Sequence, residues 1–286
     1  MIKYEVSDIS FKIASLAVKS LIYELIHFPS LGLVCATSKG SHKDMDVFTF
    51  IDSSVSLIKP FILCAEAGFK DLSLEELFSY IRDIGILGEK DMFTCTKGIN
   101  THKGALFSLG ILCAASARCI KEEDDFLNIR TIIKSMTKGL SSKELELLNK
   151  YDKKLTHGEE IYLRYGIKGI RREAEEGFPI IFNHSLKAYG EFSFGDFNDK
   201  LIYTLIMIMQ YCLDTNIIYR NGMDCLYDVQ NKAREIIEIY DVSRKMYLEK
   251  IHDLNEYLIG NNISPGGSAD ILSATIFLHE VNQKLF

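Results

Sequence analysis

The sequence has no excess of basic residues, only four prolines and no long apolar run. Its 33 lysines and arginines are outnumbered by 39 aspartates and glutamates, and the net charge is −6. This balance argues against a nucleic-acid-binding surface, so any polyanion must bind in a local pocket. Three of the four prolines adjoin clusters of polar residues, which suggests that helix breaks coincide with functional segments.

Features of export and membrane insertion are also missing. Residues 1–8 have neither the basic nor the apolar region of a signal peptide, and the most apolar stretch, residues 201–213, is too short to span a bilayer. The seven cysteines form no CxxC pair, and most lie in apolar helical stretches, as is typical of reduced, buried thiols. We expect a cytoplasmic protein with no membrane segment and no nucleic-acid partner.

Alternation typical of strands is scarce, whereas apolar residues recur at helical spacing along most of the chain. Two capping boxes, Ser73 with Glu76 and Thr156 with Glu159, predict helix starts. No linker, composition shift or internal repeat marks a boundary. The sequence therefore predicts an all-α protein, a single multi-helix globular domain over residues 1–286, with roughly ten or more helices whose ends form a central polar cleft.

Residues 98–104 place polar side chains between two glycines, directly before the apolar run 105–112. Asn100, Thr101, His102 and Lys103 would then lie at the start of a buried helix. Helix N-termini attract anions, because their first N–H groups lack partners and the helix dipole is positive there. The alternative is an ordinary capped helix start with an extended surface lysine.

Residues 40–46 offer a second polar cluster. If a helix begins near Ser41, His42 and Asp46 lie on one face, with Lys43 and Asp44 beside them. Two carboxylates and a histidine suit Mg²⁺, which usually takes one or two carboxylates together with phosphate oxygens. Alternatively, Ser41 caps the helix and the acidic residues favour the positive end of its dipole.

Residues 264–270 resemble a second anion loop before an apolar helix over residues 271–278. Gly266 and Gly267 let backbone N–H groups approach a ligand, and Ser264 and Ser268 add short donors. The alternative is a turn followed by an N-cap, with Asp270 favouring the dipole.

Two further segments carry charged groups. Asp214, Asn216 and Arg220 follow the apolar stretch 201–213, and a carboxylate at a helix C-terminus needs a specific partner: Arg220, a metal or a ligand hydroxyl. Arg171 with Glu173 can form a guanidinium fork for phosphate, supported by a carboxylate. The alternative for this second pair is a solvated helix face.

Taken together, residues 40–46, 98–104, 169–174, 214–216 and 264–270 resemble the triphosphoribosyl-dephospho-coenzyme A synthase family, in family order. The resemblance implies that ATP and 3′-dephospho-CoA are the substrates and that the 2′-hydroxyl of dephospho-CoA displaces adenine from the ribose of ATP. The product would be the prosthetic-group precursor for the acyl carrier subunit of citrate lyase or malonate decarboxylase. A downstream acyl-carrier-protein transferase is an implied partner.

Breaking an N-glycosidic bond builds oxocarbenium character, which calls for a carboxylate, an acid toward adenine and cations for the triphosphate. In this interpretation Asp46 is the base, His102 assists adenine departure or binds phosphate, and Glu173 is a further catalytic residue. Asp44 and Asp214 are assigned to the Mg²⁺ expected with ATP. The residues assigned to ATP and its triphosphate are His42, Lys43, Asn100, Thr101, Lys103, Arg171, Asn216, Arg220, Ser264, Gly266, Gly267, Ser268 and Asp270.

The chain also departs from the family pattern. Family members commonly have lysine and aspartate where this sequence has Ser30 and Cys35, and Lys39 or Arg172 are candidates to replace the lysine. These losses leave open a non-catalytic nucleotide-binding paralogue. A separate alternative is a Mg²⁺-dependent helical nucleotide pyrophosphohydrolase, suggested by two acidic pairs: Glu173 with Glu176, and Glu238 with Asp241.

Overall fold

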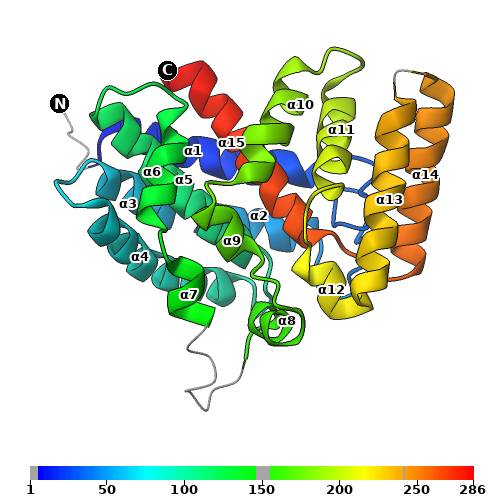
Figure 1. Ribbon diagram of the computed structural model, residues 1–286, viewed down its shortest axis with the longest axis horizontal. Helices are drawn as coiled ribbons and strands as arrows, with labels where there is room; N and C mark the ends of the chain where they lie inside the picture. Colours follow the sequence, from blue (N-terminus) through cyan, green and yellow to red (C-terminus); the bar gives the residue numbers. More distant parts are fainter. Residues whose placement is uncertain (1–5, 146–154, 241) are drawn as a thin grey trace.

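The computed structural model describes residues 6–145, 155–240 and 242–286 (Figure 1). Within these ranges the regular structure is helical, and an isolated bridge between Cys35 and Ser38 is the extent of β pairing. The all-α prediction is confirmed.

The helices follow one another closely along the chain. In order they are α1 (Asp8–Leu25), α2 (Val47–Ser56), α3 (Ile58–Gly68), α4 (Leu74–Cys95), α5 (Lys103–Lys121), α6 (Asn128–Met136), α7 (Leu140–Leu145), α8 (His157–Tyr165), α9 (Ile170–Glu175), the π-helix η2 (Ile181–Ser185), α10 (Leu186–Glu191), α11 (Phe197–Met209), α12 (Thr215–Asn221), α13 (Met223–Ile239), α14 (Arg244–Gly260) and α15 (Gly266–Leu285).

The core lies where α1, α3, α5 and α15 pack against one another (Figure 1). The chain from Ala105 to Cys119 is buried on all sides except at Phe107, as expected for a helix that is apolar around its whole circumference. Small residues let the backbones approach closely: a Cβ on Gly68 of α3 would overlap the carbonyl oxygen of Ala114. This packing brings the N-termini of α5 and α15 to one side of the core.

Membrane insertion can be judged by helix length and composition. Val47–Gly68, which comprises α2 and α3, and Lys103–Lys121, which is α5, are both long and apolar enough to cross a membrane. In the folded protein 78% of the apolar window of α5 is buried, compared with 33% for Val47–Gly68. Helix α5 is therefore a core helix of the kind that soluble proteins contain.

The predicted capping boxes are confirmed: Ser73 and Glu76 begin α4, and Thr156 and Glu159 begin α8. Helix α2 begins later than predicted, because Asp46 is its N-cap. The Ser41 hydroxyl donates to the carbonyl of Ile263 (2.7 Å) and caps no helix. The prediction that His42 and Asp46 share a helix face is therefore wrong, since both precede the helix.

Two other boundaries differ from the prediction. Helix α11 ends at Met209, so residues 210–213 form a separate turn before α12. Helix α15 begins at Gly266, five residues before the predicted start, and the Ala269 N–H already donates to the carbonyl of Pro265 (3.0 Å). The predicted anion loop over residues 264–270 is thus mostly the first turn of α15.

Candidate active site

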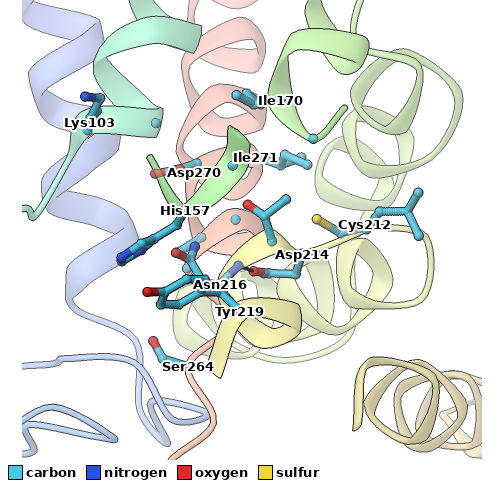
Figure 2. Close-up of a pocket in the computed structure, with 18 of the residues that line it drawn as sticks. Lys103, His157, Ile170, Cys212, Asp214, Asn216, Tyr219, Ser264, Asp270 and Ile271 are labelled. Atoms are coloured by element: carbon cyan, nitrogen blue, oxygen red, sulfur yellow. Dashed lines mark hydrogen bonds between the residues drawn. The ribbon is translucent and has the colours of Figure 1, made fainter. Parts of the chain in front are cut away.

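A cavity of about 1090 Å³ lies where the N-terminal turns of α5, α8, α9, α12 and α15 meet the segment between α1 and α2. Figure 2 shows residues of these elements around it. Most of the predicted site residues line this cavity: His42, Asp44, Asn100, Thr101, His102, Lys103, Arg171, Glu173, Asp214, Asn216, Arg220, Ser264, Gly266, Gly267 and Asp270. Lys43, Asp46 and Ser268 do not line it.

Asp214 is 1% exposed and joins the N-termini of α12 and α15. Its Oδ1 accepts the N–H groups of Asn216 (3.0 Å) and Ile217 (3.4 Å), and its Oδ2 accepts the N–H (2.8 Å) and hydroxyl (3.1 Å) of Ser268. A Cβ on Gly267 would lie 3.1 Å from this carboxylate. The specific partner that Asp214 was expected to need is therefore a pair of helix N-termini, with the carboxylate in the position of a bound anion.

Asp270 plays the same part at the start of α5. A Cβ on Gly104 would overlap the Asp270 carboxylate, and the backbone of Ala105 donates a hydrogen bond to it. Burial, and then the charges of Asp214 and Glu24, raise the pKa of Asp270 well above its usual range. A carboxyl group of the protein itself therefore occupies the α5 N-terminus, and the binding of a phosphate there stays a prediction.

His102, the N-cap residue of α5, is 3% exposed. Its Nδ1 lies 2.8 Å from the Ser53 hydroxyl, which accepts a hydrogen bond from Thr101 Oγ1 (2.6 Å). When Ser53 donates its proton to Nδ1, the imidazole carries its hydrogen on Nε2, which has no partner among the described residues. Burial lowers the pKa of His102 to about 3, which makes it a neutral hydrogen-bond donor.

Another part of the cavity wall is formed by three segments that lie far apart in the sequence. His42 Nε2 lies 2.8 Å from the hydroxyl of Ser264, and Arg220 stands in the last turn of α12 close enough to act on His42. Burial and then the Arg220 charge lower the pKa of His42, while Asp44 acts in the opposite direction. This wall therefore combines a neutral imidazole with an exposed guanidinium.

Cations surround the rest of the opening. Lys103 Nζ lies 2.6 Å from Glu89 Oε1, and Arg172 Nε lies 2.7 Å from Glu176 Oε1. Arg171 lies beside the start of α8, and Lys168, which the sequence reading left out, also lines the cavity. Of the two candidates to replace the missing family lysine, Arg172 lines the cavity and Lys39 does not.

Glu173 lies half-buried on α9 at the cavity wall. Its Oε2 accepts the N–H of Ile180 (3.4 Å), and burial raises its pKa to about 7. Its carboxyl group can therefore exchange a proton near neutral pH.

The sequence also provided no prediction for Glu24, His157 and Tyr219, which line the cavity. Glu24 is 5% exposed and faces the cavity from α1, and burial raises its pKa to about 8. The available signal was an acidic residue beside Leu21 and Leu25 in an apolar helical stripe. His157 and Tyr219 stack their rings 3.7 Å apart at the rim (Figure 2); no sequence signal connects them, because they come from different helices.

Asp46 and the metal assignment remain predictions. Asp46 Oδ1 accepts the N–H (3.1 Å) and hydroxyl (3.0 Å) of Thr49, and these hydrogen bonds lower its pKa. Among the described residues no group of three or more His, Cys, Asp or Glu side chains is placed to hold a metal. Asp44, exposed at the wall, fits as one carboxylate for a phosphate-bound Mg²⁺. To bind Mg²⁺, the Asp214 carboxylate would first have to break its hydrogen bonds with the N–H groups at the starts of α12 and α15.

The carboxylates expected for a pyrophosphohydrolase do not gather here. Glu173 and Glu176 line the cavity, Glu238 does not, and Asp241 lies outside the described residues. Among the described residues, the cavity lining therefore contains the first of the two acidic pairs that suggested a pyrophosphohydrolase, but not Glu238 of the second pair.

Comparisons with known proteins agree over most of the chain. The profile of the ATP:dephospho-CoA triphosphoribosyl transferase family matches residues 10–285. A protein of Lactiplantibacillus plantarum assigned as 2-(5''-triphosphoribosyl)-3'-dephosphocoenzyme-A synthase is 41% identical, over 92% of this chain and 94% of the relative. A Malonomonas rubra protein with the same assignment is 33% identical, over 100% of this chain and 92% of its own.

The fold also has a counterpart among solved structures. A crystal structure from Archaeoglobus fulgidus, assigned to triphosphoribosyl-dephospho-coA synthase, superposes with a TM-score of 0.50 at 18% identity and covers 80% of this chain and 97% of its own. At that identity the likeness concerns the fold alone.

Proposed function

Because the chain belongs to the ATP:dephospho-CoA triphosphoribosyl transferase family, we propose that it moves the 5-triphosphoribosyl group of ATP to the 2′-hydroxyl of 3′-dephospho-CoA and releases adenine. The family match over residues 10–285 carries this proposal. The cavity supports it, because four of the five segments that first suggested the family, 98–104, 169–174, 214–216 and 264–270, contribute most of their residues to its lining. The fifth segment, 40–46, contributes His42, Asp44 and Met45.

The biological setting follows from the same reaction. We expect the product to be the prosthetic-group precursor for the acyl carrier subunit of citrate lyase or malonate decarboxylase, passed on by an acyl-carrier-protein transferase. We also expect the protein to work in the cytoplasm, where both nucleotide substrates are available.

The triphosphate would lie among the cationic side chains of the opening. Asp214 and Asp270 already accept N–H groups at the starts of α5, α12 and α15. Phosphate oxygens therefore depend on charged side chains, with Lys103, Arg171 and Arg220 as the proposed contacts. Mg²⁺ brought by ATP would neutralise part of the phosphate charge, and Asp44 is placed to contact it.

The reacting ribose would lie deeper, near His102. As a neutral donor, the Nε2–H of His102 can hydrogen-bond to adenine or to the ribose, but it cannot add positive charge for phosphate. The base role predicted for Asp46 is untested. Asp46 does not line the cavity, whereas Asp270 does, so Asp270 is a second candidate to accept the proton of the attacking hydroxyl.

The direct test mixes the purified protein with ATP, Mg²⁺ and 3′-dephospho-CoA and follows adenine by chromatography and the adduct by mass spectrometry. We expect adenine and a triphosphoribosyl adduct in equal amounts, and no adenine when the acceptor is omitted. Pyrophosphate without adenine would instead favour a pyrophosphohydrolase. Tight ATP binding with neither product would favour a non-catalytic paralogue.

A further inference from the structure

Glu24 is a buried carboxyl group without a hydrogen-bond partner among the described residues. It lies in the last turns of α1, is 5% exposed, and lines the cavity. No described residue donates a hydrogen bond to its side chain, and burial is the cause of its raised pKa. Leaving a buried polar group unpaired is costly, so stability alone does not account for glutamate at this position.

A second carboxyl group lies nearby. Helix α1 packs against α5 and α15, and Glu24 is close enough to Asp270 for its charge to act on that residue. Asp270 receives a backbone hydrogen bond at the α5 N-terminus, which favours its ionised form, whereas Glu24 receives none. Two like charges in one buried site disfavour double ionisation, so the pair holds a proton near neutral pH. The Ala105 donor at Asp270 favours the arrangement with this proton on Glu24.

We propose that Glu24 is the catalytic acid that protonates the departing adenine, with Asp270 as the carboxylate that accepts the proton of the attacking hydroxyl. This inference rests on the proposed function. It names the acid and the base that substitution at the ribose needs while C1′ acquires oxocarbenium character.

The proton and electron balance of the step is complete within the cavity. The bond between the ribose C1′ and adenine breaks, and its electron pair leaves with the base, which takes the Glu24 proton. The acceptor oxygen forms a new bond to C1′ and loses its proton to Asp270. After the products leave, transfer of that proton from Asp270 to Glu24 restores the starting state, so no outside acid, base or oxidant is required.

The test compares Glu24→Gln, which keeps the shape but has no proton to give, with Glu24→Asp, which keeps an acid on a shorter side chain. Glu66→Gln is the matched control, because Glu66 contacts Ser7 near the start of α1 and lies outside the cavity. We expect Glu24→Gln to lower kcat for adenine release by about 10² to 10⁴ while the ATP dissociation constant changes by less than about threefold. Glu24→Asp should retain more activity than Glu24→Gln, and Glu66→Gln should match the wild type.

A changed leaving group separates an acid from a merely structural residue. In N7-methylated ATP the purine is already cationic and leaves without taking up a proton, so the ratio of wild-type to Glu24→Gln rates should fall at least tenfold relative to the ratio with ATP. An equal loss on both nucleotides, or Glu24→Gln turnover of ATP within threefold of the wild type, overturns the inference while leaving the transferase activity in place. Absence of adenine release by the wild-type protein would overturn the proposed function itself.

Discussion

Burial decides the protonation of individual groups in the cavity. His102 is held neutral because the ring is enclosed. When Ser53 donates to its Nδ1, the hydrogen of the neutral ring lies on Nε2. Glu24 keeps its proton at neutral pH because burial disfavours its charged form. Whether His102 and Glu24 can donate a proton or a hydrogen bond to a substrate is therefore decided by the side chains around each of them rather than by residue type.

Ser53→Ala tests the orientation of His102. The variant removes the hydroxyl that fixes the Nε2–H tautomer, so kcat for adenine release should fall about five- to tenfold, the value of one lost hydrogen bond. Ser56→Ala is the matched control on the same helix, since that hydroxyl donates to the Ser53 carbonyl and lies outside the cavity. Equal activity of the two variants would remove Ser53 from this role.

Glu24 should also make stability depend on pH. Its pKa of about 8 in the folded protein exceeds the ordinary value of 4.5 for a free glutamate side chain, so between these two values the folded state keeps a proton that the unfolded chain releases. This contribution is fully present below about pH 4.5 and is lost as the pH rises to about 8.

The Glu24→Gln variant has no proton to lose. The difference in unfolding free energy between Glu24→Gln and wild type should therefore rise in favour of the variant by on the order of a few kcal/mol from about pH 5 to about pH 8. Urea unfolding across this range measures it, and Glu173 and Asp270 titrate in both proteins. Parallel curves would show that the Glu24 carboxyl ionises normally.

At the scale of elements, the wall of the cavity is formed largely by helix N-termini. Acidic side chains accept hydrogen bonds from the N–H groups at several of these N-termini. The capping boxes of α4 and α8 could be predicted, because their partners lie within four residues along the chain. The double cap by Asp214 could not, because Ser268 is 54 residues away and meets it only after α12 and α15 have packed.

Asp214→Ala should therefore destabilise the protein in the absence of any ligand. Losing caps at two helices and leaving their N–H groups unpaired should lower the unfolding free energy by about 2 to 4 kcal/mol. Asp44→Ala, at an exposed carboxylate, is the control and should be close to neutral. A residue that served only as a magnesium ligand would behave differently: Asp214→Ala would then alter stability only when Mg²⁺ and ATP are present.

For the whole molecule, the cavity exists because segments from Glu24 to Ser273 converge on it, while α13 and α14 take no part in its lining. ATP binding should slow amide hydrogen exchange in the first turns of α5, α9, α12 and α15 together, because one ligand bridges them. Exchange in α13 and α14 should stay unchanged and serves as the internal control. Protection confined to a single helix would contradict a shared nucleotide site.

The sequence by itself determined the helical class, several helix starts and the segments that carry polar groups, since these depend on periodicity and on hydrogen bonds between near neighbours. It misplaced the starts of α2 and α15, where Asp46 and Gly266 begin the helices. Only the tertiary structure decided that Asp214 and Asp270 fill the helix N-termini and that Glu24 is enclosed without a partner. Burial and charge at these three residues depend on groups from distant helices, and no local pattern records which helices will meet.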